Sequence, residues 1–322
     1  MSDPFDASKA HAFASRGSYA GVPARNLNDL GDAGVVILGA PLDWGATYRA
    51  GARFGPKAIR NTDYLGFDGY RPHLPTGIDA LGVLNVVDAG DLVLPPGYMD
   101  ECIDRIGEAV ETIARHGSVP IILGGDHSIT WPNARAIAAV HGDIALIHFD
   151  AHADTGNTSP SGMLVGHGTP MRRLIESGAV AGHRFVQIGL RGYWPEPETV
   201  AWMEEQGMRT YLMTDIVERG MRAVVDDAVA YAAEGADAVF LSVDIDVVDP
   251  GMAPGTGTPE PGGITSRELL DTLRRLSRQL NVVGADIVEV SPPYDGPGEI
   301  TAFLANRCVL EILNGMAERK LL

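Results

Sequence analysis

The chain has 322 residues of ordinary globular composition, 45% hydrophobic and 21% charged, with a formal net charge of −17. This acidic balance argues against nucleic acids and anionic membranes as partners, because both require a basic face. The chain shows neither a signal peptide nor an apolar run near the ~18 residues of a membrane span, and Cys102 and Cys308 have no metal or redox spacing, so we expect a cytoplasmic protein with reduced thiols.

Beyond a polar N-terminal segment, short apolar runs alternate with amphipathic segments along the chain. We predict that residues 1–30 form an N-terminal arm and that residues 31–322 form a single catalytic domain, since no repeat or Ser/Gly linker divides them. The alternation is typical of βαβ units and a parallel sheet. Strands are predicted over residues 34–39, 83–88, 119–123, 144–149, 184–190, 209–213, 238–244 and 282–289. Helices are predicted over residues 100–116, 130–140, 169–178, 195–206, 218–233, 265–279 and 300–319.

The predicted strands are apolar almost throughout, which indicates that both faces of the sheet are covered. The fold class is therefore α/β, a three-layer arrangement with an eight-stranded, mainly parallel sheet. The stretch "TSRE" reads as a capping box at the start of a helix, with Thr265 as the N-cap and Glu268 three residues later.

Three of the predicted strands end in residues typical of metal sites. "PIILGGDHS" ends the run at 119–123, "IHFDAHAD" the run at 144–149 and "VFLSVDID" the run at 238–244. In an extended chain, residues i and i+2 point to one face, and close carboxylates are costly to bury unless a cation neutralises them. Ligands of parallel sheets lie beyond the carboxyl ends of the strands, so a metal site explains these clusters better than chance acidic turns. The candidate ligands are His127, Asp150, His152, Asp154, Asp244 and Asp246.

These ligands also indicate how many ions bind and of which kind. Two histidines and four aspartates can serve two ions if Asp150 and Asp244 bridge them. Oxygen-rich ligation suits Mn²⁺ better than structural Zn²⁺, with Ni²⁺ as the alternative because the order of metal affinities favours it. Two neighbouring ions can hold a water molecule and lower its pKa, which points to a hydrolase.

The same motifs resemble the signatures of the ureohydrolase family, which includes arginase and agmatinase. The resemblance rests on "GGDHS" (124–128), "DAHAD" (150–154) and "SVDIDVVDP" (242–250), with further matches at 39–60, 167–170, 255–263 and 289–295. It runs from about residue 34 to 315 and is closer to the agmatinase and guanidino-acid branch than to arginase. It implies an arginase-like fold, two Mn²⁺ per chain and assembly into trimers or hexamers.

The resemblance also assigns the ligands to the two ions. It implies that one ion takes His127, Asp150, Asp154 and Asp244. It implies that the other takes Asp150, His152, Asp244 and Asp246. Every ligand of the family pattern is present in this chain.

Three residues are expected to act on the substrate. The resemblance implies that His167 shuttles protons, which an imidazole pKa near neutrality suits; the alternative is a solvent-exposed histidine at a helix start. It implies that Glu289 pairs with a guanidinium, whereas an ordinary strand-end salt bridge is the alternative, and Asp286 is the nearest other acid. Asp154 is expected to orient the nucleophile and to pass its proton to the departing amine.

The sequence leaves the roles of two further residues undecided. Asp126 adjoins a predicted ligand, and His148 lies on the same strand face as Asp150. Both could hold a ligating side chain in place. For His148, a histidine satisfied within the core is nearly as good an explanation.

We therefore predict hydrolysis of a small guanidino compound to urea and a primary amine. Agmatine is the first choice of substrate, and guanidinobutyrate or another guanidino acid is the second. The substrate tail is expected to meet the loop 155–166, the loop near Trp44 and Tyr48, and residues 191–196. A different amidase or deacetylase on the same fold, or a non-catalytic binding protein, are the remaining alternatives.

Overall fold

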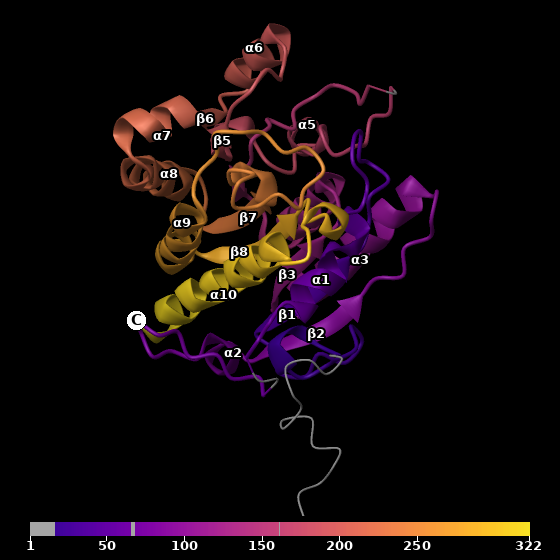
Figure 1. Cartoon of the computed structure of the whole chain (residues 1–322), viewed down its shortest axis with the longest axis vertical. Helices are drawn as coiled ribbons and strands as arrows, with labels where there is room; N and C mark the ends of the chain where they lie inside the picture. Colours follow the sequence, from indigo (N-terminus) through magenta and orange to yellow (C-terminus); the bar gives the residue numbers. More distant parts are fainter. Residues whose placement is uncertain (1–16, 66–67, 161) are drawn as a thin grey trace, which may run out of the picture.

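The computed structural model describes residues 17–65, 68–160 and 162–322, and its centre is a parallel sheet (Figure 1). The sheet has eight strands in the order β2-β1-β3-β8-β7-β4-β5-β6, and every pair is parallel. The strands are β1 (Val35–Ala40), β2 (Val86–Asp91), β3 (Val119–Gly124), β4 (Ile144–Phe149), β5 (Phe185–Leu190), β6 (Arg209–Leu212), β7 (Ala238–Asp244) and β8 (Val282–Val288). The predicted α/β class is confirmed, with a sheet that is wholly rather than mainly parallel.

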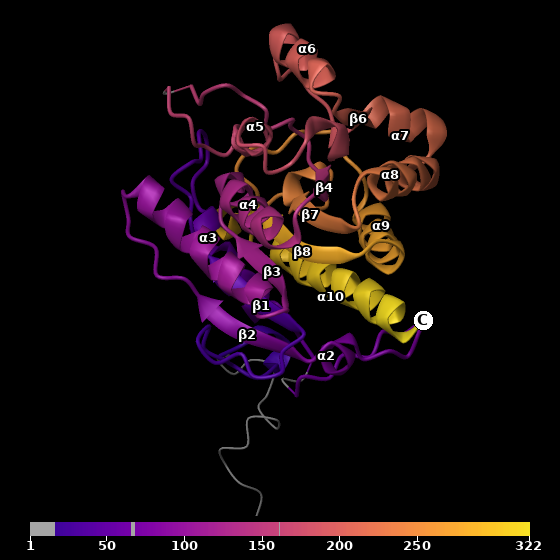
Figure 2. The ribbon, with the colours of Figure 1, turned by 180° about the vertical axis from the view of Figure 1, so that it is seen from behind.

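Helices cover both faces of the sheet (Figures 1 and 2). Alternate residues of a strand face opposite layers: Val35 and Ile37 of β1 join the core under α1, α8, α9 and α10, whereas Val36 and Leu38 join the core under α3, α4 and α5. The helices are α1 (Gly55–Asn61), α2 (Ala80–Val83), α3 (Met99–Arg115), α4 (Thr130–His141), α5 (Pro170–Glu176), α6 (Pro197–Glu205), α7 (Met213–Arg219), α8 (Met221–Gly235), α9 (Ser266–Gln279) and α10 (Ile300–Leu321). Short 3₁₀ turns are η2 (Tyr19–Gly21), η3 (Ala52–Phe54), η4 (His127–Ile129), η5 (Gly182–Arg184), η6 (Ile245–Val247) and η7 (Pro292–Tyr294).

Two predicted boundaries are wrong for local reasons. The strand predicted from residue 83 begins at Val86, because α2 precedes it, with Asp79 accepting the amide of Gly82 at 3.2 Å. The helix predicted over 218–233 begins only at Met221, as α8, because Gly220, with a φ of 80°, separates it from α7 (Met213–Arg219), a short helix that the sequence did not predict. A left-handed glycine ends a helix, so the chain turns there and starts a new one.

The capping box is confirmed at the start of α9. The amide of Glu268 donates to the Thr265 hydroxyl at 3.2 Å, and the amide of Thr265 donates to the Glu268 carboxylate at 2.8 Å. Both otherwise unpaired amides at this helix end are therefore satisfied.

The predicted N-terminal arm is described only in part, because residues 1–16 lie outside the described residues. From residue 17 onward it packs on the body of the protein: Tyr19 is buried, and its hydroxyl donates to the carbonyl of Asn306 at 2.8 Å. Within the described ranges, no helix is long and apolar enough to cross a membrane.

The strand order decides where the predicted ligands meet. β8 and β7, the last strands of the chain, are inserted between β3 and β4, so β3, β8, β7 and β4 are four consecutive neighbours. Because all four run in the same direction, the segments that follow them emerge at one edge of the sheet.

Candidate active site

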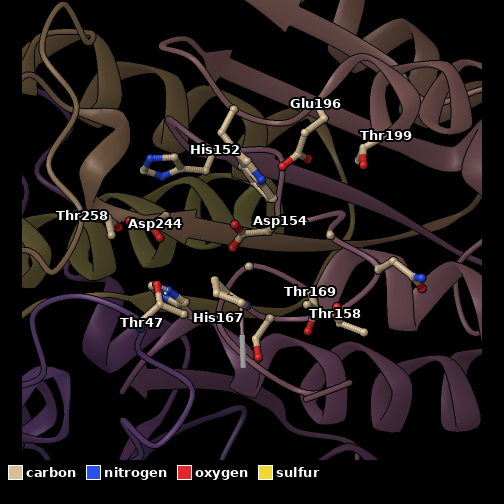
Figure 3. Close-up of a pocket in the computed structure, with 16 residues that line it drawn as sticks. Thr47, His152, Asp154, Thr158, His167, Thr169, Glu196, Thr199, Asp244 and Thr258 are labelled. Atoms are coloured by element: carbon tan, nitrogen blue, oxygen red, sulfur yellow. Dashed lines mark hydrogen bonds between the residues drawn. The ribbon is translucent and has the colours of Figure 1, made fainter. Parts of the chain in front are cut away.

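The carboxyl ends of these four strands supply the polar side chains of the site. His127 follows β3, Glu289 follows β8, Asp244 ends β7 and Asp150 follows β4. All four residues are buried. The sheet topology therefore gathers residues that lie far apart in the sequence, and Figure 3 shows Asp154 and Asp244 beside His152 at one end of a cavity.

His127 is the centre of a first cluster of ligand atoms. Its Nδ1 lies 2.8 Å from Asp154 Oδ2, 3.1 Å from Asp150 Oδ2 and 3.2 Å from Asp244 Oδ2. This nitrogen is buried and makes no hydrogen bond to any described residue, whereas Nε2 contacts the Ser242 hydroxyl at 2.9 Å. A ring nitrogen aimed at three carboxylate oxygens without bonding any of them fits the donor set of a metal ion.

His152 forms a second cluster beside the first. Its Nδ1 lies 3.1 Å from Asp246 Oδ2 and 3.5 Å from Asp150 Oδ1. Asp150 thus directs one oxygen to His127 and the other to His152, as a bridging carboxylate would. Asp244 directs Oδ2 to His127, but its Oδ1 accepts the amide of Asp246 at 2.8 Å.

The electrostatics of both clusters show a shortage of positive charge. Burial and the charges of Asp246 and Asp150 raise the pKa of Asp244 well above its usual range. Burial lowers the pKa of His152, but the carboxylates of Asp246 and Asp150 raise this pKa by more than burial lowers it, and the result is about 12. A buried carboxylate and an imidazole that both favour the protonated form mark a place where divalent cations would supply the same charge.

His148, whose role the sequence left open, supports Asp150 through a hydrogen bond. Its Nε2 lies 2.7 Å from Asp150 Oδ2, and its Nδ1 lies 3.0 Å from the side-chain nitrogen of Gln187. The same nitrogen donates to the carbonyl of Ala153 at 2.7 Å, which identifies it as the amide NH₂. Nδ1 of His148 therefore accepts, and Nε2 donates to Asp150 and orients it. Sequence reasoning missed Gln187, although a glutamine inside an otherwise apolar strand was a usable signal.

Asp126 holds the loop that follows β1. Its Oδ2 accepts the amide of Gly45 at 2.7 Å, and its Oδ1 accepts the amide of Ser128 at 3.0 Å. Burial and the charge of Glu289 raise the pKa of Asp126 to about 6. A β-carbon at Gly45 would lie only 2.9 Å from the backbone nitrogen of His167, so the loop after β1 passes directly against His167.

Thr47, on that loop, completes a chain of contacts through His167 to Glu289. Glu289 Oε1 accepts the amide of His127 at 2.9 Å and lies 3.1 Å from His167 Nδ1. The amide of Thr47 donates to His167 Nε2 at 3.2 Å, and its hydroxyl lies 2.7 Å away. Because the amide can only donate, Nε2 accepts and Nδ1 carries the ring proton. Sequence reasoning missed Thr47, which is 120 residues away from His167.

His167 can gain a second proton readily. Burial lowers the pKa of His167, but the hydrogen bond to Glu289 and the charge of Glu289 raise this pKa by more than burial lowers it, and the result is about 9. Taking that proton at Nε2 would release the Thr47 amide, so the two states differ by one contact. His167 is also buried, unlike the solvent-exposed histidine that was the alternative interpretation.

Asp154 and Glu289 share a strained backbone. Their φ angles are 52° and 61°, in the left-handed region that side chains rarely adopt. Such a conformation costs about 1–3 kcal/mol and is found where the surrounding structure imposes it, often at active sites. Both residues were predicted to act on the substrate.

The cavity above the clusters has a volume of about 700 Å³ (Figure 3). Of the segments predicted to meet the substrate tail, the loop 155–166 contributes wall residues from Gly156 to Pro160, and residues 191–196 contribute Trp194 and Glu196. Trp44 and Tyr48 are not part of the wall, but Thr47 is. The lining is completed by His152, Asp154, His167, Gly168, Thr169, Thr199, Asp244 and Thr258.

Glu289 and Asp286 lie outside the cavity lining and differ in whether a carboxylate oxygen is free to bind a guanidinium. Glu289 is 1% exposed and does not line the cavity, yet its Oε2 makes no hydrogen bond to any described residue. Asp286, the other acid considered for the guanidinium, accepts from the Thr130 hydroxyl at 2.8 Å and from the Asn133 amide at 2.9 Å. Asp286 is thus committed to the core and is not available to a substrate.

Comparisons with known proteins agree with this geometry. The arginase family profile matches residues 33–314. The chain is 41% identical to proclavaminate amidinohydrolase of Streptomyces clavuligerus over 87% of both chains, and the solved structure of that protein superposes with a TM-score of 0.89 over 96% of this chain and 100% of the other, at 37% identity. It is 38% identical to guanidinopropionase of Pseudomonas aeruginosa over 98% of this chain and 96% of the relative. It is 37% identical to agmatinase of Bacillus subtilis over 89% of this chain and 93% of the relative.

Proposed function

This chain belongs to the arginase family of ureohydrolases, hydrolases that act on carbon–nitrogen bonds of amidines, and from this premise we propose that it is a binuclear manganese amidinohydrolase. Its proposed reaction converts a small guanidino compound, agmatine as the first choice, into urea and a primary amine. The observation that carries the proposal is the unbonded Nδ1 of His127 facing the carboxylates of Asp150, Asp154 and Asp244.

The proposed ligands are those of the two clusters. One ion would be held by His127, Asp150, Asp154 and Asp244. The other would be held by Asp150, His152, Asp244 and Asp246. When bound, two such cations supply Lewis acidity that lowers the pKa of a water molecule toward neutrality. Mn²⁺ is proposed over Ni²⁺ because four of the six donors are carboxylates.

The chain's own side chains would divide the remaining work. Glu289 offers Oε2 to the N–H groups of a guanidinium, while its Oε1 stays on the His127 amide. Asp154 lies at the cavity floor, where it can orient the attacking water and pass a proton to the departing amine. His167 lines the cavity and can exchange protons with solvent through its change of state at Nε2.

The identity of the substrate tail is the finer part of the proposal. Guanidinopropionase and agmatinase are 38% and 37% identical to this chain, so similarity does not separate a guanidino acid from agmatine. The cavity wall does favour agmatine, because its described residues include no arginine or lysine to bind a carboxylate. Guanidino acids remain the second candidate, since relatives such as guanidinopropionase and guanidinobutyrase carry such substrates in their names.

A urea-release assay tests the reaction. The manganese-loaded protein is offered agmatine, guanidinobutyrate, guanidinopropionate and arginine, with the Asp150→Ala variant as the blank. We expect urea from at least one of them, and most from agmatine. Absence of urea from every guanidino compound, together with release of acid from an amide or acetylated amine, would favour the alternative amidase or deacetylase.

Assembly and location remain proposals of the same kind. We propose a homo-oligomer, a trimer or hexamer, which sedimentation velocity would measure. We also propose the cytoplasm, because Cys102 and Cys308 are both free thiols, as expected in a reducing compartment.

A further inference from the structure

We propose that Glu196 determines specificity by reading the far end of the substrate, pairing with a terminal ammonium and repelling a terminal carboxylate. The inference rests on the proposed hydrolysis of guanidino compounds, because it concerns the tail of the molecule whose guanidinium reaches the metal site. It adds a residue and a sign of charge to that proposal.

The position of Glu196 in the cavity is the first support. It lines the same cavity as Asp154 and Asp244. In Figure 3 its carboxylate points into the cavity from the side opposite His167 and Thr47, beyond the cavity floor. A chain whose guanidinium lies at the floor would therefore carry its other end toward Glu196.

The second support is that Glu196 leaves its usual local partners unused. It is the N-cap residue of α6, where an acidic side chain commonly accepts amides of the first helical turn. Here no side-chain cap bond forms, and the carboxylate makes neither a hydrogen bond nor an ion pair with any other described residue. The carboxylate therefore turns away from the helix that would stabilise it and remains free for a ligand.

The wall between the floor and Glu196 suits an uncharged methylene chain. Trp194 forms part of it, and a β-carbon at Gly156 would lie 3.4 Å from the Trp194 ring, so the ring lies close against the loop 155–166. Thr158 and Thr199 add neutral polar groups. An indole face binds methylene groups and also attracts a cation beside it.

Arginines near the cavity are engaged elsewhere and do not line it. The Arg172 guanidinium lies 4.3 Å from the centre of the Trp202 ring and pairs with Glu176. The Arg173 guanidinium also pairs with Glu176, at 2.8 Å. Arg191 donates to backbone carbonyls, including that of Asp246 at 2.8 Å. A carboxylate tail would thus find the charge of Glu196 and no compensating arginine or lysine among the described wall residues.

The test compares three substrates that differ only at the far end: agmatine, guanidinobutyrate and the uncharged butylguanidine. Because Glu196 is exposed and its charge is screened by solvent, we expect Glu196→Gln to lower kcat/KM for agmatine by about tenfold. In the same variant, kcat/KM for butylguanidine should change by less than about twofold, and kcat/KM for guanidinobutyrate should rise. Glu196→Lys should change the ratio of kcat/KM for agmatine to kcat/KM for guanidinobutyrate by about 100-fold or more, in favour of guanidinobutyrate.

Glu198→Gln is the matched control. Glu198 is an exposed acid in the first turn of the same helix but does not line the cavity, so the three ratios should stay unchanged. Equal losses for all three substrates in Glu196→Gln, or no change in any ratio, would overturn the inference. Those outcomes leave urea release intact, whereas failure of the wild type to release urea from any of the three would overturn the proposed function itself.

Discussion

The floor of the cavity and its outer wall are built in opposite ways. The floor is formed by His152, Asp154 and Asp244, which line the cavity, together with His127, Asp150 and Asp246, which contact them from behind; all six but His152 are buried. The outer wall consists of Trp194, Glu196 and residues 156–160, several of which are exposed. Each aspartate of the floor lies within hydrogen-bonding or ion-pairing distance of another floor residue, whereas Glu196 has no side-chain partner among the described residues.

This difference separates chemistry from specificity. A floor placed by four parallel strands cannot shift without moving the sheet, so the arrangement of its side chains is fixed by the fold. A wall placed by loops can change its charge without disturbing the core. Relatives named for different guanidino substrates are about equally similar to this chain, as expected if the floor is shared and the walls differ.

The largest effect should come from removing a shared floor carboxylate. We expect Asp150→Ala or Asp244→Ala to abolish activity and to lose metal, because Asp150 lies between the two clusters and both aspartates are proposed to hold both ions. Folding should survive, since the eight buried strands do not depend on the ions. Elemental analysis should find about two Mn²⁺ per chain in the wild type, following the two clusters.

Two controls make this result interpretable. Circular dichroism and the unfolding temperature of the apo wild type set the reference for both variants. A wild type with one ion per chain and full activity would contradict the two-metal proposal, as would an active Asp150→Ala variant.

The next effect concerns a residue behind the floor. Glu289→Gln keeps an oxygen for the His127 amide but removes the charge offered to a guanidinium. We expect unchanged metal content and a fall in kcat/KM of order 100-fold, the value of a charged hydrogen-bond pair. If the loss appears instead as reduced manganese content, Glu289 serves to position His127 and does not bind the substrate.

His167→Ala should separate proton transfer from metal binding. Because His167 is not a proposed ligand, both ions should remain, while kcat should fall by about 100-fold, the scale of a general acid or base. Added imidazole should restore part of the loss by filling the space left by the side chain. Full activity in this variant would remove His167 from the mechanism.

The sequence alone named side chains that the structure brings together at the floor, because the signals for them are local. Each ligand cluster follows an apolar run within a few residues, and the i, i+2 spacing of Asp150 and His152 states which way they point. The strand order was not visible in any local pattern, although the structure needs it to bring β3 beside β8. The left-handed backbone at Asp154 and Glu289 was equally invisible, because aspartate adopts it only occasionally and glutamate rarely.

The wall and its supports were harder to predict because they depend on contacts between distant segments. The loop carrying Thr47 was expected to present Trp44 and Tyr48, yet the hold of Asp126 on Gly45 turns Thr47 toward His167 instead. The short helix α7, which precedes α8, was not predicted, because seven residues directly after a strand carry too little periodicity to indicate a helix.

Thr47→Val gives the smallest and most discriminating effect, because Thr47 belongs to the wall but contacts His167. Valine keeps the shape of threonine and the backbone amide that donates to Nε2, and it removes only the hydroxyl 2.7 Å from that nitrogen. We expect kcat to fall by about two- to fivefold, the value of one neutral hydrogen bond, with KM and manganese content unchanged. Thr158→Val is the matched control, since Thr158 lines the cavity without contacting His167, and its kcat should remain within about twofold of the wild type. Stopped-assay kinetics on both variants test this expectation. If kcat is the same in Thr47→Val and Thr158→Val, the Thr47 hydroxyl has no role in the reaction. If kcat of Thr47→Val falls as far as that of His167→Ala, the hydroxyl itself carries the proton. The expected intermediate value would mean that a wall residue tunes the proton transfer without performing it.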